Sequence, residues 1–278
     1  MNRRVKIVPT ILLLLGALYS LARRVAGLRL HQGAGRAVHH VLRPAQPQRR
    51  FLENVRALNE YGDGRFWTWT LNSLIYAGGG ALLTVVVSAA CGYAMAKYRF
   101  HGRKLILGSL LAGVLVPGIT LSIPQYLLLS STGLVGTYWS VILPSVISPY
   151  SIYLCQVYAQ ASIPDEMLEA GRVDGAGEFR MLWSIGLPVM MPGLVTVFLL
   201  QFIGIWNNFL LPYIMLADDD RFPLTVGLYS LLNRGASQPA LYTLVITGAL
   251  LSIIPIFALF LFLQRYWKLD LIAGGVKG

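Results

Sequence analysis

The feature that most constrains this chain is a series of long apolar runs separated by short polar stretches. Hydrophobic residues make up 55% of its 278 residues and charged residues only 13%, whereas globular domains carry about 25% charged residues. An apolar run of about 18–20 residues crosses a bilayer as a helix. The sequence therefore predicts an all-α integral membrane protein with about six transmembrane helices. The predicted spans cover residues 7–22, 74–96, 105–129, 138–158, 184–211 and 241–263.

The first run is atypical. Its 16 residues correspond to about 24 Å of helix, less than the ~30 Å hydrocarbon core. Because Arg3, Arg4 and Lys6 precede it, it also resembles a secretory signal peptide. The spans that follow favour a short first span over a cleaved signal.

The charges of the connecting loops predict the orientation. Lys97, Arg99, Arg103 and Lys104 lie between two spans with no acidic residue among them, which places this loop in the cytoplasm by the positive-inside rule. The uncharged stretch 130–137 suits the outer side, as do the acidic residues that begin at Asp218. Six crossings then put both ends of the chain in the cytoplasm.

Residues 21–50 do not fit this pattern. The first 50 residues hold ten of the 23 Lys and Arg residues and no Asp or Glu, so the net charge of +11 arises almost entirely there. Seven arginines in a segment predicted to lie outside contradict the positive-inside tendency. Two explanations stay open: a flexible external loop that tolerates arginine, and a reading-frame disturbance that ends near Phe51. In the second case the first span is truncated.

The third run contains Pro117 and Pro124. Helix-breaking residues persist at membrane depth where neighbouring helices or a cavity satisfy the freed carbonyls. A substrate path and a packed kink explain these prolines equally well.

Residues 159–186 form a polar segment between two spans. Ser162 followed by Pro164, Asp165 and Glu166 predicts a helix start, with Ser162 as the capping residue. The Asp174-Gly175 pair predicts a turn. A second helix is expected near Gly177, with Phe179, Leu182 and Trp183 on one face.

A motif lies in this segment. Residues 169–176 read Glu-Ala-Gly-Arg-Val-Asp-Gly-Ala, and Phe179, Ile185, Pro188 and Pro192 follow. This pattern resembles the EAA coupling motif of permease subunits in bacterial ATP-binding-cassette importers. The resemblance to the maltose-type carbohydrate permeases is continuous from about residue 51 to the end. It also rests on Asn72-Ser73-Leu74, Gly92-Tyr93-Ala94-Met95-Ala96, Trp206-Asn207-Asn208-Phe209, Pro223-Leu224-Thr225-Val226-Gly227-Leu228 and Ala273-Gly274-Gly275-Val276-Lys277-Gly278.

The resemblance implies a type I importer permease fold with a cytoplasmic coupling helix, in the inner membrane of a bacterium. It implies four kinds of partner: a second permease subunit, an ATP-binding-cassette ATPase dimer, a periplasmic or lipid-anchored solute-binding protein, and a sugar. In that family a coupling helix fits a cleft on the ATPase, and the C-terminal tail reaches between the ATPase subunits. The residues expected to contact the ATPase are Glu169, Ala170, Gly171, Asp174, Gly175, Met167 and Leu168, and in the tail Gly274, Gly275, Val276 and Lys277.

Two of these residues have a second explanation. Asp174 more often serves an Asp-Gly turn than a partner contact, and Glu169 could also stabilise that turn, although partner contact is favoured for residues 169–171. Gly171 stands where the family usually has alanine. Glycine costs a helix interior up to ~1 kcal/mol relative to alanine, so the helix is expected to be looser but still formed.

Candidates for the substrate path are Trp206, Asn207, Asn208 and Pro117. An aromatic ring beside two amides could stack on a sugar and hydrogen-bond to it, and the simpler interpretation is that Trp206 is an interfacial anchor.

Other functions find little support. No G-x-x-x-x-G-K-[ST] loop is present, so ATP hydrolysis is expected on another polypeptide. No catalytic constellation, cofactor or metal site is predicted, and His39-His40 is a weak metal candidate. Nucleic-acid binding would need a basic reading module that is not visible.

We therefore expect two regions: residues 1–65, with the short first span and the basic segment, and a permease domain over 66–278. The permease domain includes the coupling loop 159–186 and the tail 264–278. The predicted function is an ATP-driven sugar importer subunit working by alternating access. The alternatives are a permease for an amino acid, peptide or polyol phosphate, and an ion-coupled secondary transporter, which would carry ionisable groups inside its spans.

Overall fold

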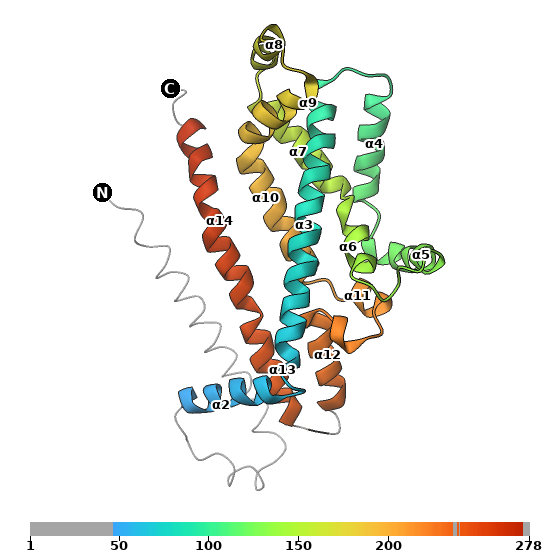
Figure 1. Ribbon diagram of the computed structural model, residues 1–278, viewed down its shortest axis with the longest axis vertical. Helices are drawn as coiled ribbons and strands as arrows, with labels where there is room; N and C mark the ends of the chain where they lie inside the picture. Colours follow the sequence, from blue (N-terminus) through green and yellow to red (C-terminus); the bar gives the residue numbers. More distant parts are fainter. Residues whose placement is uncertain (1–46, 236–237, 239, 275–278) are drawn as a thin grey trace, which may run out of the picture. The chain divides into compact units, whose positions relative to one another are not determined.

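The computed structural model describes residues 47–235, 238 and 240–274. The described residues from Glu53 onwards belong to one compact unit, and those before Glu53 belong to another. All regular elements in the described part are helices, which confirms the all-α class (Figure 1). In chain order they are α2 (Pro47–Glu60), α3 (Arg65–Lys97), α4 (Arg103–Val114), α5 (Gly118–Ser131), α6 (Trp139–Val146), α7 (Pro149–Ser162), α8 (Asp165–Val173), α9 (Glu178–Met181), the π-helix η1 (Leu182–Gly186), α10 (Leu187–Trp206), α11 (Leu210–Met215), the 3₁₀ turn η2 (Asp219–Arg221), α12 (Leu224–Gly235), α13 (Ala240–Leu251) and α14 (Ile253–Gly274).

Up to five membrane spans lie in the described residues. Arg65–Lys97, Glu178–Trp206 and Leu241–Tyr266 are each long and apolar enough to cross a bilayer. Two further spans are bent pairs of helices: α4 and α5 meet at 103°, and α6 and α7 at 42°. These five match the predicted spans from residue 74 onwards, and the predicted span 7–22 lies outside the described residues. The fifth predicted run, residues 184–211, is also interrupted, because α10 stops at Trp206 before α11 begins.

Helix α3 is the centre of the unit, in contact with α6, α7, α10 and α12. Glycine makes the closest of these contacts possible. A Cβ on Gly92 would lie 2.5 Å from Cys155 Cβ and 2.6 Å from the Gln156 nitrogen, so only a residue without a side chain lets α3 and α7 approach this closely.

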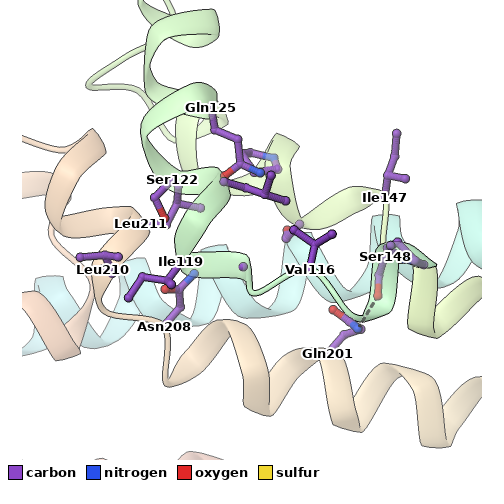
Figure 2. A pocket seen from close by; sticks show the side chains of 16 residues that line it. Val116, Ile119, Ser122, Gln125, Ile147, Ser148, Gln201, Asn208, Leu210 and Leu211 are labelled. Carbon is purple, nitrogen blue, oxygen red and sulfur yellow. Dashed lines mark hydrogen bonds between the residues drawn. The ribbon is translucent and has the colours of Figure 1, made fainter. Parts of the chain in front are cut away.

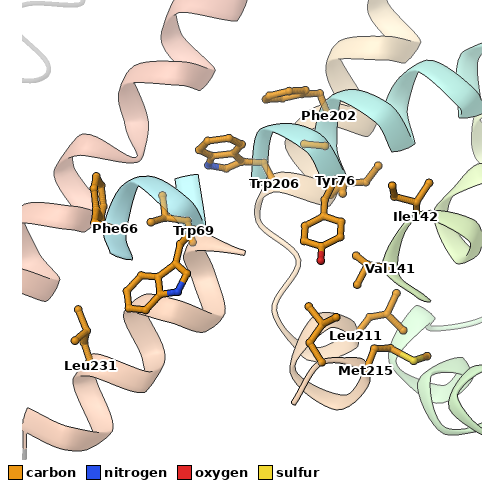
Figure 3. Close-up of a cluster of buried hydrophobic side chains, with 14 of the residues drawn as sticks. Phe66, Trp69, Tyr76, Val141, Ile142, Phe202, Trp206, Leu211, Met215 and Leu231 are labelled. Carbon is orange, nitrogen blue, oxygen red and sulfur yellow. The ribbon is translucent and has the colours of Figure 1, made fainter. Parts of the chain in front are cut away.

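Two groups of buried side chains pack along α3. The first surrounds its Arg65 end, where Phe66, Trp69 and Tyr76 meet residues of α6, α10, α11 and α12, including Val141, Phe202, Trp206, Leu211 and Leu231 (Figure 3). The second surrounds the Lys97 end, where Ala89 and Tyr93 pack with Cys155, Met181 and Met190. The two ends of α3 are thus embedded in separate cores.

The acidic loop at 218–222 is held by the first turns of α3. Its carbonyl oxygens accept hydrogen bonds from Trp69 Nε1 (3.1 Å, at Asp219), Asn72 Nδ2 (2.8 Å, at Asp220) and Tyr76 Oη (2.9 Å, at Arg221). Asn72 also accepts a 2.7 Å hydrogen bond from Tyr138. The buried polar side chains of α3 therefore donate hydrogen bonds to backbone carbonyls of a loop nearly 150 residues away in the sequence.

Candidate functional site

The 159–186 segment has the predicted helix–turn–helix form. Helix α8 is followed by Asp174 and by Gly175 at φ +75°, and α9 begins directly after Gly177. The predicted capping role of Ser162 is wrong, because Ser162 is the last residue of α7 and the position before α8 is Pro164, which makes no side-chain cap. From α9 the chain passes through η1 into α10 without leaving helical conformation. Figure 1 shows α8 at the Lys97 end of α3.

The structure divides the predicted ATPase-contact residues into an exposed and a buried set. Glu169, Ala170, Asp174 and Gly175 are exposed, and Met167 is 41% exposed. Leu168 is only 3% exposed and packs in the core at the Lys97 end of α3.

Gly171 is also buried, and a Cβ there would lie 3.2 Å from Ile185 Cδ1. Helix α8 thus packs closely against η1 at this position, and an alanine here would require a small shift of the Ile185 side chain. Leu168 and Gly171 therefore hold α8 in place and are not presented on its surface.

Large apolar side chains are exposed on this polar segment. Val173 is 88% exposed, Phe179 77% and Trp183 62%. The rings of Phe179 and Trp183 stack at 6.3 Å with an interplanar angle of 16°, which confirms that these two lie on one face. Leu182, the third residue predicted for that face, is half-buried and packs against the core at the Lys97 end of α3. Val173 was not among the predicted contact residues, although it lies four residues after Glu169 and hence on the same helix face. Exposed apolar groups of this kind are typical of a protein interface.

Polar contacts attach both helices of the segment to the end of α3. Lys97 Nζ donates hydrogen bonds to the Ile163 carbonyl and, at 2.8 Å, to Asp165 Oδ1. Tyr98 donates its hydroxyl hydrogen to Glu178 Oε2, and Arg172 Nε donates to Glu178 Oε1 at 3.2 Å.

These contacts change the acidity of the groups involved. The hydrogen bond from Lys97 lowers the pKa of Asp165. The hydrogen bonds from Tyr98 and then Arg172 lower the pKa of Glu178, whereas burial raises the pKa of Tyr98. All the carboxylates in these contacts are therefore ionised at neutral pH, which makes their hydrogen bonds the stronger, charge-assisted kind. In the sequence, Lys97 was used only to predict the orientation of the membrane spans, and no role was predicted for Tyr98 or Glu178.

A pocket of about 670 Å³ forms where three interrupted helices meet (Figure 2). The first interruption is the 103° bend between α4 and α5, the second the bend between α6 and α7, and the third the break between α10 and α11. Backbone outside a helix is tolerated at membrane depth where it is buried in protein or lines a water-filled cavity. The lining residues are Gly113, Val116, Gly118, Ile119, Leu121, Ser122, Gln125, Pro144, Ser145, Ile147, Ser148, Pro149, Gln201, Asn208, Leu210 and Leu211.

The candidates for the substrate path are placed differently from one another. Asn208 lines the pocket, and Pro117 lies between its lining residues Val116 and Gly118. Trp206 is 3% exposed and stacks on Phe202 at 5.7 Å, so it is a core residue here and not an interfacial anchor. Asn207 is exposed and donates to the Ile203 carbonyl. Pro124 lies within α5 and does not interrupt it.

Two other predictions concern the tail and metals. Gly274 is the last residue of α14, and Gly275, Val276 and Lys277 lie outside the described residues. Within the described part of the chain no group of three or more His, Cys, Asp or Glu side chains is arranged to hold a metal ion.

The chain matches a known protein family and is similar to individual transport proteins. The family described as "Binding-protein-dependent transport system inner membrane component" matches residues 88–268. The arabinooligosaccharides transport system permease protein of Halalkalibacterium halodurans is 36% identical over 215 residues, 77% of this chain and 76% of that protein. The maltodextrin transport system permease protein of Bacillus subtilis is 33% identical over 77% of this chain and 76% of its own length.

A solved structure shares the fold. It is the crystal structure of a bacterial ABC transporter involved in the import of the acidic polysaccharide alginate, one chain of which superposes with a TM-score of 0.68 at 22% identity. The match covers 96% of this chain and 99% of that one.

Proposed function

Since the chain belongs to the family of binding-protein-dependent transport system inner membrane components, we propose that it is a permease subunit of an ATP-driven importer for sugars or oligosaccharides. It lies in the bacterial inner membrane as a multi-pass protein. Its partners in this proposal are a second permease, an ATPase dimer and a solute-binding protein. The names of the relatives, which concern arabinooligosaccharides and maltodextrin, support a carbohydrate substrate.

The ATPase docks, in this proposal, on the 159–186 segment at the cytoplasmic side. The observation that carries the proposal is the set of exposed apolar side chains Met167, Val173, Phe179 and Trp183 on an otherwise polar segment. Burial of such side chains stabilises an interface by about 25 cal/mol per Å² of apolar surface removed from water, and Glu169 adds a charged contact.

The same segment connects the ATPase to the membrane helices by two routes. One is the helical continuation from α9 through η1 into α10. The other is the set of hydrogen bonds from Lys97 and Tyr98 at the end of α3. A movement imposed on α8 would thus reach two spans at once, as alternating access requires. The C-terminal tail, residues 264–278, is a second proposed contact with the ATPase.

A secondary transporter is the main alternative from another class. Such proteins place ionisable groups inside their spans for ion coupling. Between Arg65 and Lys97 the long span α3 has no Asp, Glu, Lys or Arg, and residues 105–162 have none either. This composition favours a transporter that takes its energy from a separate ATPase.

Uptake of labelled neutral oligosaccharides into cells and membrane vesicles tests the proposal. Uptake should require ATP and persist when a protonophore collapses the ion gradient. Replacement of Glu169 by alanine should lower ATP-dependent uptake about tenfold, equivalent to about 1.4 kcal/mol. Glu60→Ala, which removes an exposed carboxylate outside the 159–186 segment, is the matched control and should transport normally.

Two results would count against this account. Uptake that follows the ion gradient without ATP would contradict an ATPase-driven permease. Full transport and assembly with Glu169→Ala would remove Glu169 from the interface and leave the remainder of the proposal in place.

A further inference from the structure

The pocket at the three helix breaks lies beside the middle of helix α3. Thr84 Oγ1 donates a 2.8 Å hydrogen bond to the Ser145 carbonyl, and a Cβ on Gly80 would lie 2.8 Å from Ser145 Oγ. Residues 80 and 84 are close to the centre of the 33-residue helix α3, which is about 50 Å long at ~1.5 Å per residue. The hydrocarbon core is ~30 Å thick. With α3 centred in the bilayer, Ser145 and the pocket that it lines lie well inside the hydrocarbon core.

Three side-chain amides contribute to this pocket. Gln201 Nε2 donates to Ser148 Oγ at 3.1 Å and to Ser151 Oγ at 2.7 Å (Figure 2 shows the first of these bonds), which fixes the amide in one orientation. Its carbonyl oxygen remains as an acceptor. The side-chain amides of Gln125 and Asn208 make no hydrogen bond to the described part of the chain.

These groups have the hydrogen-bonding pattern of a hydroxyl-rich ligand. An amide offers two donors and two acceptor sites, and each sugar hydroxyl is both a donor and an acceptor. Gln125 and Asn208 are only half-buried, and their amide atoms are not among the fully buried polar atoms of the described residues, so both amides are open to water or to a polar ligand in the pocket. The cavity volume of about 670 Å³ falls in the range of ~300–1,000 Å³ that is typical of small-molecule sites.

The lining is also free of charge. None of the 16 described residues that line the pocket is Asp, Glu, Lys, Arg or His. Removing a carboxylate or phosphate from water without a cation to pair with it is far more costly than removing a neutral hydroxyl. An anionic sugar would therefore bind here much more weakly than a neutral one.

We propose that this pocket is a contact site for the uncharged units of an oligosaccharide, with Gln125, Gln201 and Asn208 as its hydrogen-bonding groups and a selectivity against anionic sugars. This proposal rests on the proposed function. It locates part of the substrate path and gives the charge class of the sugar that the path accepts. It excludes polyol phosphates and uronic acids as preferred substrates at this site.

The first test removes one amide at a time from the complete importer in its native membrane. Gln125→Leu should lower uptake of a neutral oligosaccharide two- to tenfold, the range expected for loss of one or two hydrogen bonds. Asn208→Ala should lower uptake by a similar factor. The backbone at residue 208 should stay in place, because the 2.8 Å hydrogen bond from Thr225 Oγ1 goes to the Asn208 backbone carbonyl and does not depend on the side chain. Thr120→Val is the matched control on α5, since Thr120 does not line the pocket.

The second test addresses charge with a matched pair of substrates: a labelled neutral oligosaccharide and the same molecule with one primary hydroxyl oxidised to a carboxylate. The quantity measured is the ratio of oxidised to neutral uptake in the wild type and in Gln125→Lys. A lysine in the pocket should raise this ratio several-fold. Any preference of the binding protein is the same in both strains and cancels.

The outcomes distinguish a failure of the site from a failure of the importer assignment. Normal uptake in both Gln125→Leu and Asn208→Ala, with normal complex levels, would overturn the site while the importer assignment stands. An unchanged ratio in Gln125→Lys would overturn the charge selectivity. Absence of ATP-dependent uptake of any sugar by the wild type would overturn the proposed function and, with it, this inference.

Discussion

At the scale of single residues, glycine determines how closely the helices of this protein approach. Gly92 faces α7 and Gly193 faces Tyr158, and a Cβ at either position would lie within 2.5 Å of a neighbouring atom. Gly78 lies on the same helix as Gly92 and has no such neighbour within 4 Å. The two positions of α3 therefore offer a matched comparison.

Replacement of Gly92 by alanine should destabilise the protein by about 1–3 kcal/mol, the usual cost of overpacking. Gly78→Ala should be neutral or should stabilise by up to ~1 kcal/mol, since alanine is the better helix former. The midpoint of thermal unfolding of the chain purified in mild detergent measures both. Equal midpoints for the two variants would mean that the contact between α3 and α7 is looser than described.

At the scale of elements, the turn between α8 and α9 is the feature on which the 159–186 segment, the proposed docking site of the ATPase, depends. Gly175 has φ +75°, whereas Gly177 has φ −69°. Neither has an atom within 4 Å of an added Cβ, so only the backbone conformation distinguishes them. The left-handed conformation costs a residue with a side chain about 1–2 kcal/mol.

Gly175→Ala should therefore lower transport and ATPase stimulation, and Gly177→Ala should change neither. The measurement is substrate-stimulated ATP hydrolysis by the assembled importer, compared at equal complex levels. Normal stimulation with Gly175→Ala would show that the turn tolerates strain or that α8 is not positioned by it.

The attachment of the segment to α3 should depend on pH. Because folding lowers the pKa of Glu178 from its ordinary value of 4.5, the ionised carboxylate stabilises the folded state above pH 4.5. That contribution is lost as the pH falls through the lowered pKa. Glu178→Gln should thus lower the thermal midpoint at pH 7 and show a smaller further decrease below pH 4.5 than the wild type.

Glu166→Gln is the control for this titration, since Glu166 is exposed and has no hydrogen bond or ion pair with the described residues. It should follow the wild-type pH profile. A Glu178→Gln profile parallel to that of the wild type would contradict the contact with Tyr98 and Arg172.

At the scale of the whole molecule, the apolar runs predict most of the spans but not their interruptions. Long uncharged runs identify membrane helices because the bilayer excludes charge over a fixed thickness. Pro117 marks one break, yet Pro124 and Pro192 lie inside continuous helices, since a neighbouring helix can compensate for the lost hydrogen bond. The break after Trp206 has no proline before Pro212.

The candidate site is predictable in its local form only. The turn at Asp174-Gly175 follows from residue chemistry, and so does the exposed pair Phe179 and Trp183. The bond between Lys97 and Asp165, 68 residues apart, depends on how whole helices pack. The same holds for the burial of Leu168 and for the meeting of three breaks at one pocket, which no local pattern reveals.

We expect this permease to work only with a separate ATPase docked on the 159–186 segment. The most direct measurement is affinity purification of the tagged chain from its own membranes in mild detergent, with mass spectrometry of the proteins that co-elute. The wild type should bring down a second permease and an ATPase with a phosphate-binding loop. Val173→Asp, which places a charge on the most exposed apolar residue of the segment, should lose the ATPase and retain the second permease. A wild-type chain that elutes alone, under conditions that preserve other membrane complexes, would contradict the account.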